Sequence, residues 1–311
     1  MDKKYAIGID LGGTNLRVGL VTSAGEVEKK IKEPTTEEVL AAVLRAIESL
    51  YREDIAGIGL GVAGVIGRGS NRVLASPNLH IIEKIDLVNE IRDKFKVPVF
   101  IENDANVAAL CELWLGAGKG LSNFVLFTLG TGIGGGIVYG RKLLRVSAEI
   151  GHMSVHADGE KCPCGNSGCL ESYASVRAIL TKAFSMLEAG RESSLRQYCG
   201  GNFYKLTTEE IYRAALDGDG LARELLKNAG KYLGIGIANM VNIMSPEAVI
   251  LAGGLTGAWD IYVQEAMKEA SRRAFKEIFE GVKIIPSLLM DDAGIIGAAG
   301  LVLHSIDMNE I

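Results

Sequence analysis

Three of the five cysteines of this chain lie within eight residues of one another, and a histidine precedes them by ten positions. They are Cys162, Cys164 and Cys169, preceded by His152. Three thiolates and one imidazole are ligands that Zn²⁺ accepts in a closed, tetrahedral structural site. We therefore predict structural Zn²⁺ on these four residues, with His156 as an alternative to His152. A redox pair or a disulfide is the competing interpretation, against which the odd cysteine count argues.

Two glycine-rich turns occupy matching places in a strand–turn–strand pattern that occurs twice, once at residues 5–22 and once at residues 124–139. Backbone N–H groups in such turns can approach phosphate oxygens because no Cβ stands in the way. Each turn alone is also compatible with an ordinary tight hairpin. Together they indicate two loops that hold a polyphosphate. The loop residues are Gly12, Gly13, Thr14 and Asn15 in the first turn and Gly130, Thr131 and Gly132 in the second.

The glycines also match a dinucleotide pattern, but their context does not. G-x-G-x-x-G occurs at residues 59–64 and again at residues 130–135. A dinucleotide fingerprint needs a helix directly after the glycines, whereas extended, glycine-spaced sequence follows both matches. We therefore set a dinucleotide site aside.

Two further features fit a nucleotide and its metal ion. Asp10 precedes the first turn, where its carboxylate could hold Mg²⁺ against phosphates, directly or through water. The alternative is an aspartate that only caps the turn. Gly253 and Gly254 follow an apolar strand and open a helix, an arrangement that would let an adenosine lie against the helix start.

A second group of polar residues lies at the end of a predicted strand. Glu102, Asn103 and Asp104 follow the apolar run at residues 97–101 and precede a helix. Open α/β sheets bind ligands at this position. Asp104 is either a carboxylate that deprotonates a hydroxyl or the N-cap of the helix, and position alone does not decide between them.

Other residues supply the partners that such a base would need. Glu149, His152 and Glu171 add two carboxylates and an imidazole, and Asn103 adds an amide. Vicinal hydroxyls donate hydrogen bonds to carboxylates, and an uncharged ligand needs no counter-ion. A sugar is therefore the ligand that this set of side chains suits.

The elements that must position these residues alternate between strands and helices, as in α/β folds. Thr35 and Glu38 predict a capping box before an amphipathic helix. We expect two domains, residues 1–117 and 118–295, with the helix at about 296–311 packing back onto the first. Further helices are predicted at about 105–115, 172–189, 208–217, 220–244 and from Gly254 to about 279, and further strands at 55–62, 97–101 and 248–252.

Composition narrows the class of protein. With 311 residues, 48% of them hydrophobic, the chain can form two substantial cores. A net charge of −5 without a basic run argues against nucleic-acid binding. There is no run of about 18 apolar residues, so we expect no membrane span. The start of the chain has no signal-peptide pattern, and we expect a cytoplasmic protein.

The chain resembles the ROK family of sugar kinases and repressors, and its glucokinase and hexokinase branch in particular. The resemblance extends over nearly the whole chain. It is carried by IGIDLGGTNLRVGLV, IENDANVAALCELWLGAG, FVLFTLGTGIGGGIVYG, EIGHMSV, CPCGNSGCLE and LAGGL. It implies an actin/hexokinase-like α/β fold of duplicated ribonuclease-H-like domains around an interdomain cleft. It also implies ATP as phosphoryl donor, Mg²⁺ as cofactor and zinc on the cysteine knuckle.

The resemblance also implies roles for individual residues. Asp104 would be the base, and one ring nitrogen of His152 would bind zinc while the other faces a sugar hydroxyl. The leading expectation is phosphorylation of glucose or a similar aldohexose at the C6 hydroxyl. The alternatives are a kinase of N-acetylmannosamine or another amino sugar, and a sugar-sensing protein without turnover. The implied sugar contacts are Gly64, Asn78, Asn103, Asp104, Glu149, His152 and Glu171.

The chain departs from its relatives at two places. Related glucokinases usually carry PNLPGW where this chain has PNLHII at residues 77–82, so the choice of sugar is open. Family repressors carry a helix-turn-helix before the first glycine loop, whereas about four residues precede the first strand here. We therefore expect a small-molecule sugar and a nucleotide as ligands, no nucleic acid or membrane partner, and a homodimer or homotetramer.

Overall fold

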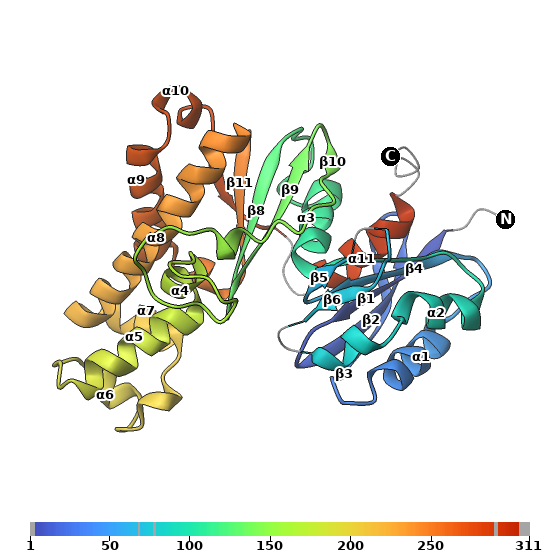
Figure 1. Ribbon diagram of the computed structural model, residues 1–311, viewed down its shortest axis with the longest axis horizontal. Helices are drawn as coiled ribbons and strands as arrows, with labels where there is room; N and C mark the ends of the chain where they lie inside the picture. Colours follow the sequence, from blue (N-terminus) through green and yellow to red (C-terminus); the bar gives the residue numbers. More distant parts are fainter. Residues whose placement is uncertain (1–3, 68, 77–78, 289–291, 305–311) are drawn as a thin grey trace. The chain divides into compact units, whose positions relative to one another are not determined.

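The computed structural model describes residues 4–67, 69–76, 79–288 and 292–304, and the chain folds into two compact units (Figure 1). Unit 1 comprises Met1–Ser122, Gly136–Ser147 and Ser287–Ile311, and unit 2 comprises Asn123–Gly135 and Ala148–Pro286. The chain therefore passes between the units four times. The domain bounds expected from the sequence, 1–117 and 118–295, stay a prediction.

Unit 1 contains a five-stranded sheet in which an antiparallel hairpin continues into parallel strands. The predicted hairpin is present, because the first and second strands pair antiparallel from Tyr5 with Thr22 to Leu11 with Leu16. The order across the sheet is β3 (Val27–Pro34), β2 (Asn15–Thr22), β1 (Tyr5–Leu11), β4 (Ile55–Val62) and β7 (Val99–Asn103).

Helices cover both faces of this sheet (Figure 1). On one face, α1 (Val39–Leu50) and α2 (Leu87–Phe95) pack on alternate strand residues such as Ile7 and Ile9. On the other face, α11 (Ala293–Leu303) packs on β1 and β4, and α3 (Asp104–Leu115) packs on α11. The alternation of buried residues along β1 follows from the two-residue period of a strand.

The predicted capping box before α1 is wrong. Glu38 is the N-cap residue of α1, and no side chain caps this helix. Thr35 instead donates its hydroxyl to the Gly12 carbonyl oxygen at 2.7 Å, and its N–H donates to the Thr14 carbonyl oxygen at 3.0 Å. The Thr35 hydroxyl, which would have capped the helix in the predicted motif, is thus hydrogen-bonded to a residue distant in sequence.

The sheet of unit 2 has the same strand order as the sheet of unit 1. In both sheets the hairpin comes first and two parallel strands complete the other edge. The division between the units falls within β9, so β10 and the end of β9 are grouped with unit 1. The order is β10 (Lys142–Leu143), β9 (Ile133–Tyr139), β8 (Phe124–Leu129), β11 (Ala248–Ala252) and β12 (Lys283–Pro286).

The helices of unit 2 match the sequence expectations in part. The helix expected over 172–189 is interrupted at Ser175, whose hydroxyl caps the second part by accepting the Ala178 N–H at 3.1 Å. The long helix expected after Gly254 is broken into a 3₁₀ segment, a π-helical segment and two α-helices. The α-helices are α4 (Glu171–Ala174), α5 (Val176–Glu188), α6 (Leu195–Tyr198), α7 (Thr208–Leu216), α8 (Gly220–Met244), α9 (Gln264–Arg273) and α10 (Lys276–Phe279).

Short elements complete the chain. The strands β5 (Val65–Ile66) and β6 (Val73–Ala75) pair with each other. The short helical segments among the described residues are η1 (His80–Lys84), η2 (Ile150–His152), η3 (Phe203–Lys205), η4 (Gly254–Ala258) and η5 (Trp259–Val263). Within the described part of the chain, no helix has the length and apolar character needed to cross a bilayer.

Candidate functional site

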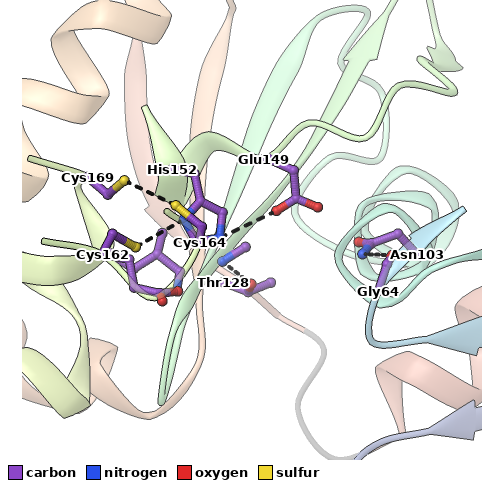
Figure 2. Close-up of polar contacts among 11 residues, drawn as sticks. Gly64, Asn103, Thr128, Glu149, His152, Cys162, Cys164 and Cys169 are labelled. Atoms are coloured by element: carbon purple, nitrogen blue, oxygen red, sulfur yellow. Dashed lines mark hydrogen bonds and ion pairs between the residues drawn. The ribbon is translucent and has the colours of Figure 1, made fainter. Parts of the chain in front are cut away.

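The cysteine knuckle of unit 2 brings the four predicted zinc ligands together (Figure 2). One ligand atom from each of His152, Cys162, Cys164 and Cys169 lies within 4.8 Å of the other three. The Cys164 and Cys169 sulfurs are 3.7 Å apart, and the Cys162 sulfur is 3.6 Å from His152 Nδ1. Ligands bound at 2.0–2.3 Å on tetrahedral corners are roughly 3.3–3.8 Å apart, so the geometry is compatible with zinc.

The electrostatics of the knuckle also favour a cation. Burial, together with the neighbouring thiols, raises the pKa of Cys169 to about 12. A backbone hydrogen bond from Asn166 lowers the pKa of Cys164. Thiolates crowded this closely repel one another, and a bound metal ion removes that penalty by neutralising them. His156 is not part of this group among the described residues; its ring lies 6.1 Å from that of Tyr173.

The backbone of unit 2 holds the imidazole of His152 between the knuckle and a carboxylate (Figure 2). The ring belongs to η2, with Nδ1 facing Cys162 and Nε2 lying 4.0 Å from Glu149 Oε2. Burial raises the pKa of Glu149; the neighbouring His152 opposes this rise and Glu171 adds to it. Glu149, His152 and Glu171, which the sequence assigned to one polar ring, thus interact within this unit.

Glu171 links the knuckle to the second glycine turn. It begins α4 two residues after Cys169, and its Oε2 accepts the Ile133 N–H at 2.9 Å. A Cβ on Gly132 would collide with this carboxylate, so a larger residue there would displace Glu171 from the turn. The contact between Glu171 and the turn is not evident from the sequence, where the two are separated by 38 residues.

The glycine motifs of unit 2 meet at the ends of two neighbouring parallel strands. Gly130, Thr131 and Gly132 follow β8, and Gly253 follows β11 beside it. Gly253 has a φ of +96°, and a Cβ there would collide with the Leu129 carbonyl oxygen. Around Gly130 and Gly254 a Cβ would meet nothing within 4 Å. The backbone here is open to a ligand.

Thr128 is a polar residue of this turn that sequence reasoning missed. Its hydroxyl accepts the Gly134 N–H at 3.2 Å and so ties the end of β8 to the start of β9 (Figure 2). A lone threonine in an otherwise apolar strand was the only signal in the sequence.

In unit 1, Asn103 and Asp104 have different roles at the start of α3. Asn103, not Asp104, is the N-cap: its Oδ1 accepts the Ala105 N–H at 2.9 Å. Its Nδ2 donates to the Gly64 carbonyl oxygen at 2.9 Å (Figure 2). Asp104 is the first helical residue, with an exposed side chain whose Oδ1 also accepts the Ala105 N–H. The interpretation of Asp104 as the N-cap is therefore wrong.

The first glycine turn is held by backbone contacts. The Gly12 N–H donates to the Asn15 carbonyl oxygen at 3.0 Å, and Thr35 fixes Gly12 and Thr14 from outside the turn. Gly13 and Thr14 are exposed. Rigid turns with exposed N–H groups can bind a phosphate group.

Asp10 lies next to this turn, half-buried at the end of β1. Burial raises the pKa of its carboxyl, and Arg17 on the paired strand opposes the rise, with Nη1 3.7 Å from Asp10 Oδ2. A carboxylate beside a phosphate turn is the kind of hard oxygen ligand that Mg²⁺ binds. Asp10 thus lies beside the turn, and its role toward Mg²⁺ stays a prediction.

A buried polar network behind Asn103 was missed by sequence reasoning. Glu102 Oε1 accepts the Asn103 N–H at 2.9 Å and Asn106 Nδ2 at 3.1 Å. Asn106 Nδ2 also donates to the Val146 carbonyl oxygen at 2.9 Å. An asparagine on the buried face of an apolar helix was the available signal. Asn78, the remaining predicted sugar contact, lies outside the described residues.

Comparisons with known proteins agree on one family. The ROK family model matches residues 6–305. The chain is 32% identical to a glucokinase of Halalkalibacterium halodurans, over 97% of this chain and 96% of that protein. It is 33% identical to a xylose repressor of Caldicellulosiruptor bescii, over 96% of this chain and 78% of the repressor.

A solved structure with the same fold carries ligands. It is a ROK family glucokinase from Streptomyces griseus in complex with glucose and AMPPNP, 31% identical, with a TM-score of 0.82 over 96% of this chain and 99% of that one. The two sheets of matching order and this similarity define an actin/hexokinase-like α/β fold. The chain belongs to the ROK family.

Proposed function

We propose that this protein is an ATP-dependent sugar kinase, which transfers the γ-phosphoryl group to the C6 hydroxyl of glucose or a similar aldohexose. The division of roles at the start of α3 carries the proposal. Asn103 caps the helix and holds Gly64, so the exposed Asp104 carboxylate is not needed as the cap. A carboxylate in this position can orient a hydroxyl and accept its proton.

The sugar contacts in this proposal are Asn103 and Gly64 beside the base, Asn78, and the interacting set Glu149, His152 and Glu171. Burial raises the pKa of Glu149, and its carboxylate can accept a hydrogen bond from a hydroxyl group, which supports a role toward an uncharged ligand. His152 would present Nε2 to the sugar, since Nδ1 faces the knuckle.

The donor in this proposal is ATP with Mg²⁺. The phosphates would lie against the N–H groups of residues 12–15 and 130–132, and the adenosine against Gly253 and Gly254, where the backbone is open. Asp10 would hold Mg²⁺, which when bound neutralises charge on the transferred phosphoryl group. The ATP analogue in the Streptomyces griseus structure supports this choice of donor.

The zinc in this proposal is structural. Three thiols and one imidazole make up the ligand set of a closed structural site, and no step of the transfer is assigned to the ion. Its effect would pass through His152, which the ion orients, and through Glu171, which directly follows the knuckle and contacts the second glycine turn.

Sugar binding without turnover is the second candidate, and the identity with a xylose repressor is what favours it. The net charge of −5 argues against a nucleic-acid partner for this chain. Turnover separates the sugar kinase from the sugar-binding protein.

We infer a homodimer or homotetramer as the working assembly, to be measured by light scattering.

ADP release tests the proposal. Purified protein with ATP and Mg²⁺ is assayed against glucose, mannose, N-acetylmannosamine, N-acetylglucosamine and xylose, with the Asp104→Asn variant as blank. We expect sugar-dependent ADP release with glucose in the accepted set. Turnover of N-acetylmannosamine without turnover of glucose would replace the substrate assignment. Sugar binding without ADP release for any sugar would replace the enzyme with a sensor.

A further inference from the structure

The first turn of α11 lies directly against the Asp10 carboxylate in unit 1. The residue at the point of contact is Gly294, which has no side chain. A Cβ at this position would be 2.7 Å from Asp10 Cγ, 2.8 Å from Oδ2 and 3.0 Å from Asp10 Cβ. Ordinary Cβ contacts are longer than about 3.4 Å, so even a methyl group at position 294 requires something to move.

The backbone of α11 is packed closely on both sides, since a Cβ on Gly297 of this helix would collide with the Val107 carbonyl oxygen of α3. A Cβ on Gly8 of β1 would collide with the Ile295 carbonyl oxygen, and one on Gly59 of β4 would collide with the Ala298 carbonyl oxygen. The backbone of α11 is therefore packed directly on the backbone of two central strands. Close-packed interiors transmit a displacement rather than absorb it.

The beginning of α11 is also anchored from the side. Asp292, the N-cap residue of α11, receives both of its carboxylate contacts from Lys30 of β3, with Nζ 3.0 Å from each oxygen. The Asp10 side chain is the more mobile partner, because its carboxylate turns about two single bonds. A methyl group at position 294 would thus displace the Asp10 carboxylate.

We propose that Gly294 is a positioning residue for Asp10. Because Gly294 has no side chain, the first turn of α11 packs directly against the Asp10 carboxylate and sets its orientation toward Mg²⁺. The inference rests on the proposed function, because the role of Asp10 toward Mg²⁺ belongs to it. Arg17 lies 3.7 Å from Oδ2, the same oxygen that Gly294 faces. Two neighbours, one steric and one charged, therefore fix one carboxylate oxygen.

The test compares Gly294→Ala with Gly300→Ala, a matched change in the same helix. A Cβ on Gly300 would meet Leu110 and Trp114 at 3.4 Å, which is ordinary contact. Both changes raise helix propensity. Gly300→Ala should therefore be at least as stable as wild type, whereas in Gly294→Ala the displacement of the Asp10 carboxylate offsets that gain. For Gly294→Ala alone we expect a higher Mg²⁺ concentration for half-maximal rate and a loss of roughly 10- to 100-fold in kcat/KM for MgATP, as a misplaced group produces. The glucose Kd without nucleotide should not change.

An Mg²⁺ dependence and turnover of Gly294→Ala within about threefold of Gly300→Ala would overturn the inference. The Asp10→Ala background provides a second measurement. With no carboxylate to displace, and only the contact with the Cβ of residue 10 left, the further change Gly294→Ala should give a more favourable change in Tm than it gives in the wild-type background. The same measurement is decisive if Gly294→Ala alone folds poorly. If Tm does not recover in the Asp10→Ala background, the contact between position 294 and the Asp10 carboxylate is not the cause, and the inference is contradicted.

Asp10→Asn separates failure of this inference from failure of the proposed function. If Asp10→Asn retains wild-type turnover and Mg²⁺ dependence, the proposed role of Asp10 is wrong, and the inference falls with it. If Asp10→Asn is inactive and Gly294→Ala behaves like Gly300→Ala, only the positioning role of Gly294 is wrong.

Discussion

At the scale of single residues, two carboxylates of unit 1 lie in contrasting settings. Asp104 is exposed at the first position of α3, where its neighbour Asn103 serves as the cap. Asp10 is half-buried between Arg17 and the first turn of α11. An exposed carboxylate that is not needed as the cap can accept a proton from a bound ligand. A partly buried one pays a desolvation cost that a bound cation would offset.

The desolvation of Asp10 makes a prediction about stability and pH. Burial raises its pKa in the folded state above its ordinary value of 3.8. The stability that the protonated group contributes is complete below the unfolded-state pKa and is lost as pH rises through the folded-state pKa. Without Mg²⁺, Asp10→Asn should therefore melt at a higher temperature than wild type at pH 7.

The gap in Tm between Asp10→Asn and wild type should narrow as pH falls toward 4, because wild-type Asp10 then takes up its proton. Thermal melts at several pH values in a chelating buffer measure it. Asp54→Asn serves as a control on the same unit. A gap that is absent at pH 7, or that widens with acid, contradicts this account of Asp10.

At the scale of elements, α3 holds segments next to three of the four chain passages between the units. Glu112, buried on this helix, accepts the Ala117 N–H at 2.6 Å, and the Ser287 hydroxyl donates to its other oxygen. Asn106 holds the Val146 carbonyl oxygen. The helix that begins with the proposed base is thus also the anchor for these segments.

Glu112→Ala should lower the free energy of unfolding by roughly 1–3 kcal/mol, because it removes a buried carboxylate that accepts hydrogen bonds from the half-buried Ala117 N–H and from the Ser287 hydroxyl. Urea denaturation measures the change. Glu90→Ala, at an exposed position of α2, is the matched control and should cost little. Equal stability of the two variants would show that the Glu112 contacts contribute nothing.

Local sequence patterns were sufficient for some elements and not for others. The β1–β2 hairpin and the helices at 208–216 and 220–244 could be predicted, because their hydrophobic periods and turn residues are local. The Thr35 capping box failed because a carbonyl 23 residues away takes the hydroxyl. The break at Ser175 could not be predicted, because a serine within a helical pattern can either continue the helix or cap a new one. Only the structure shows that the Ser175 hydroxyl accepts the Ala178 N–H.

At the scale of the whole molecule, the two sheets have the same order of hairpin and parallel strands. The repeat of strand, glycine turn and strand was readable in the sequence, and it predicted this duplication. The candidate site was readable where residue type and spacing group the side chains, as for Cys162 and Cys164. It was not readable where the contact is between distant segments, as for Glu171 with Gly132 or Gly294 with Asp10.

Loss of zinc should affect much of unit 2. Cys164→Ser should abolish stoichiometric zinc and also turnover, because the knuckle precedes Glu171 and holds His152. Structural zinc contributes on the order of 10 kcal/mol of binding free energy, so we expect local disorder around residues 152–171 and rapid proteolysis there. Cys199→Ser, at a buried cysteine outside the cluster, is the control. Elemental analysis that finds active protein without stoichiometric metal would contradict this prediction.

The most direct test of the central claim is single-turnover phosphoryl transfer by Asp104→Asn. Because Asn103 caps α3, the variant should fold with a Tm near that of wild type, and it should bind glucose with a similar Kd. An amide accepts a hydrogen bond from the sugar hydroxyl but cannot take its proton, so the rate should fall by roughly 10²- to 10⁴-fold. A transfer rate within about threefold of wild type, with Tm and Kd unchanged, would show that Asp104 is not the base.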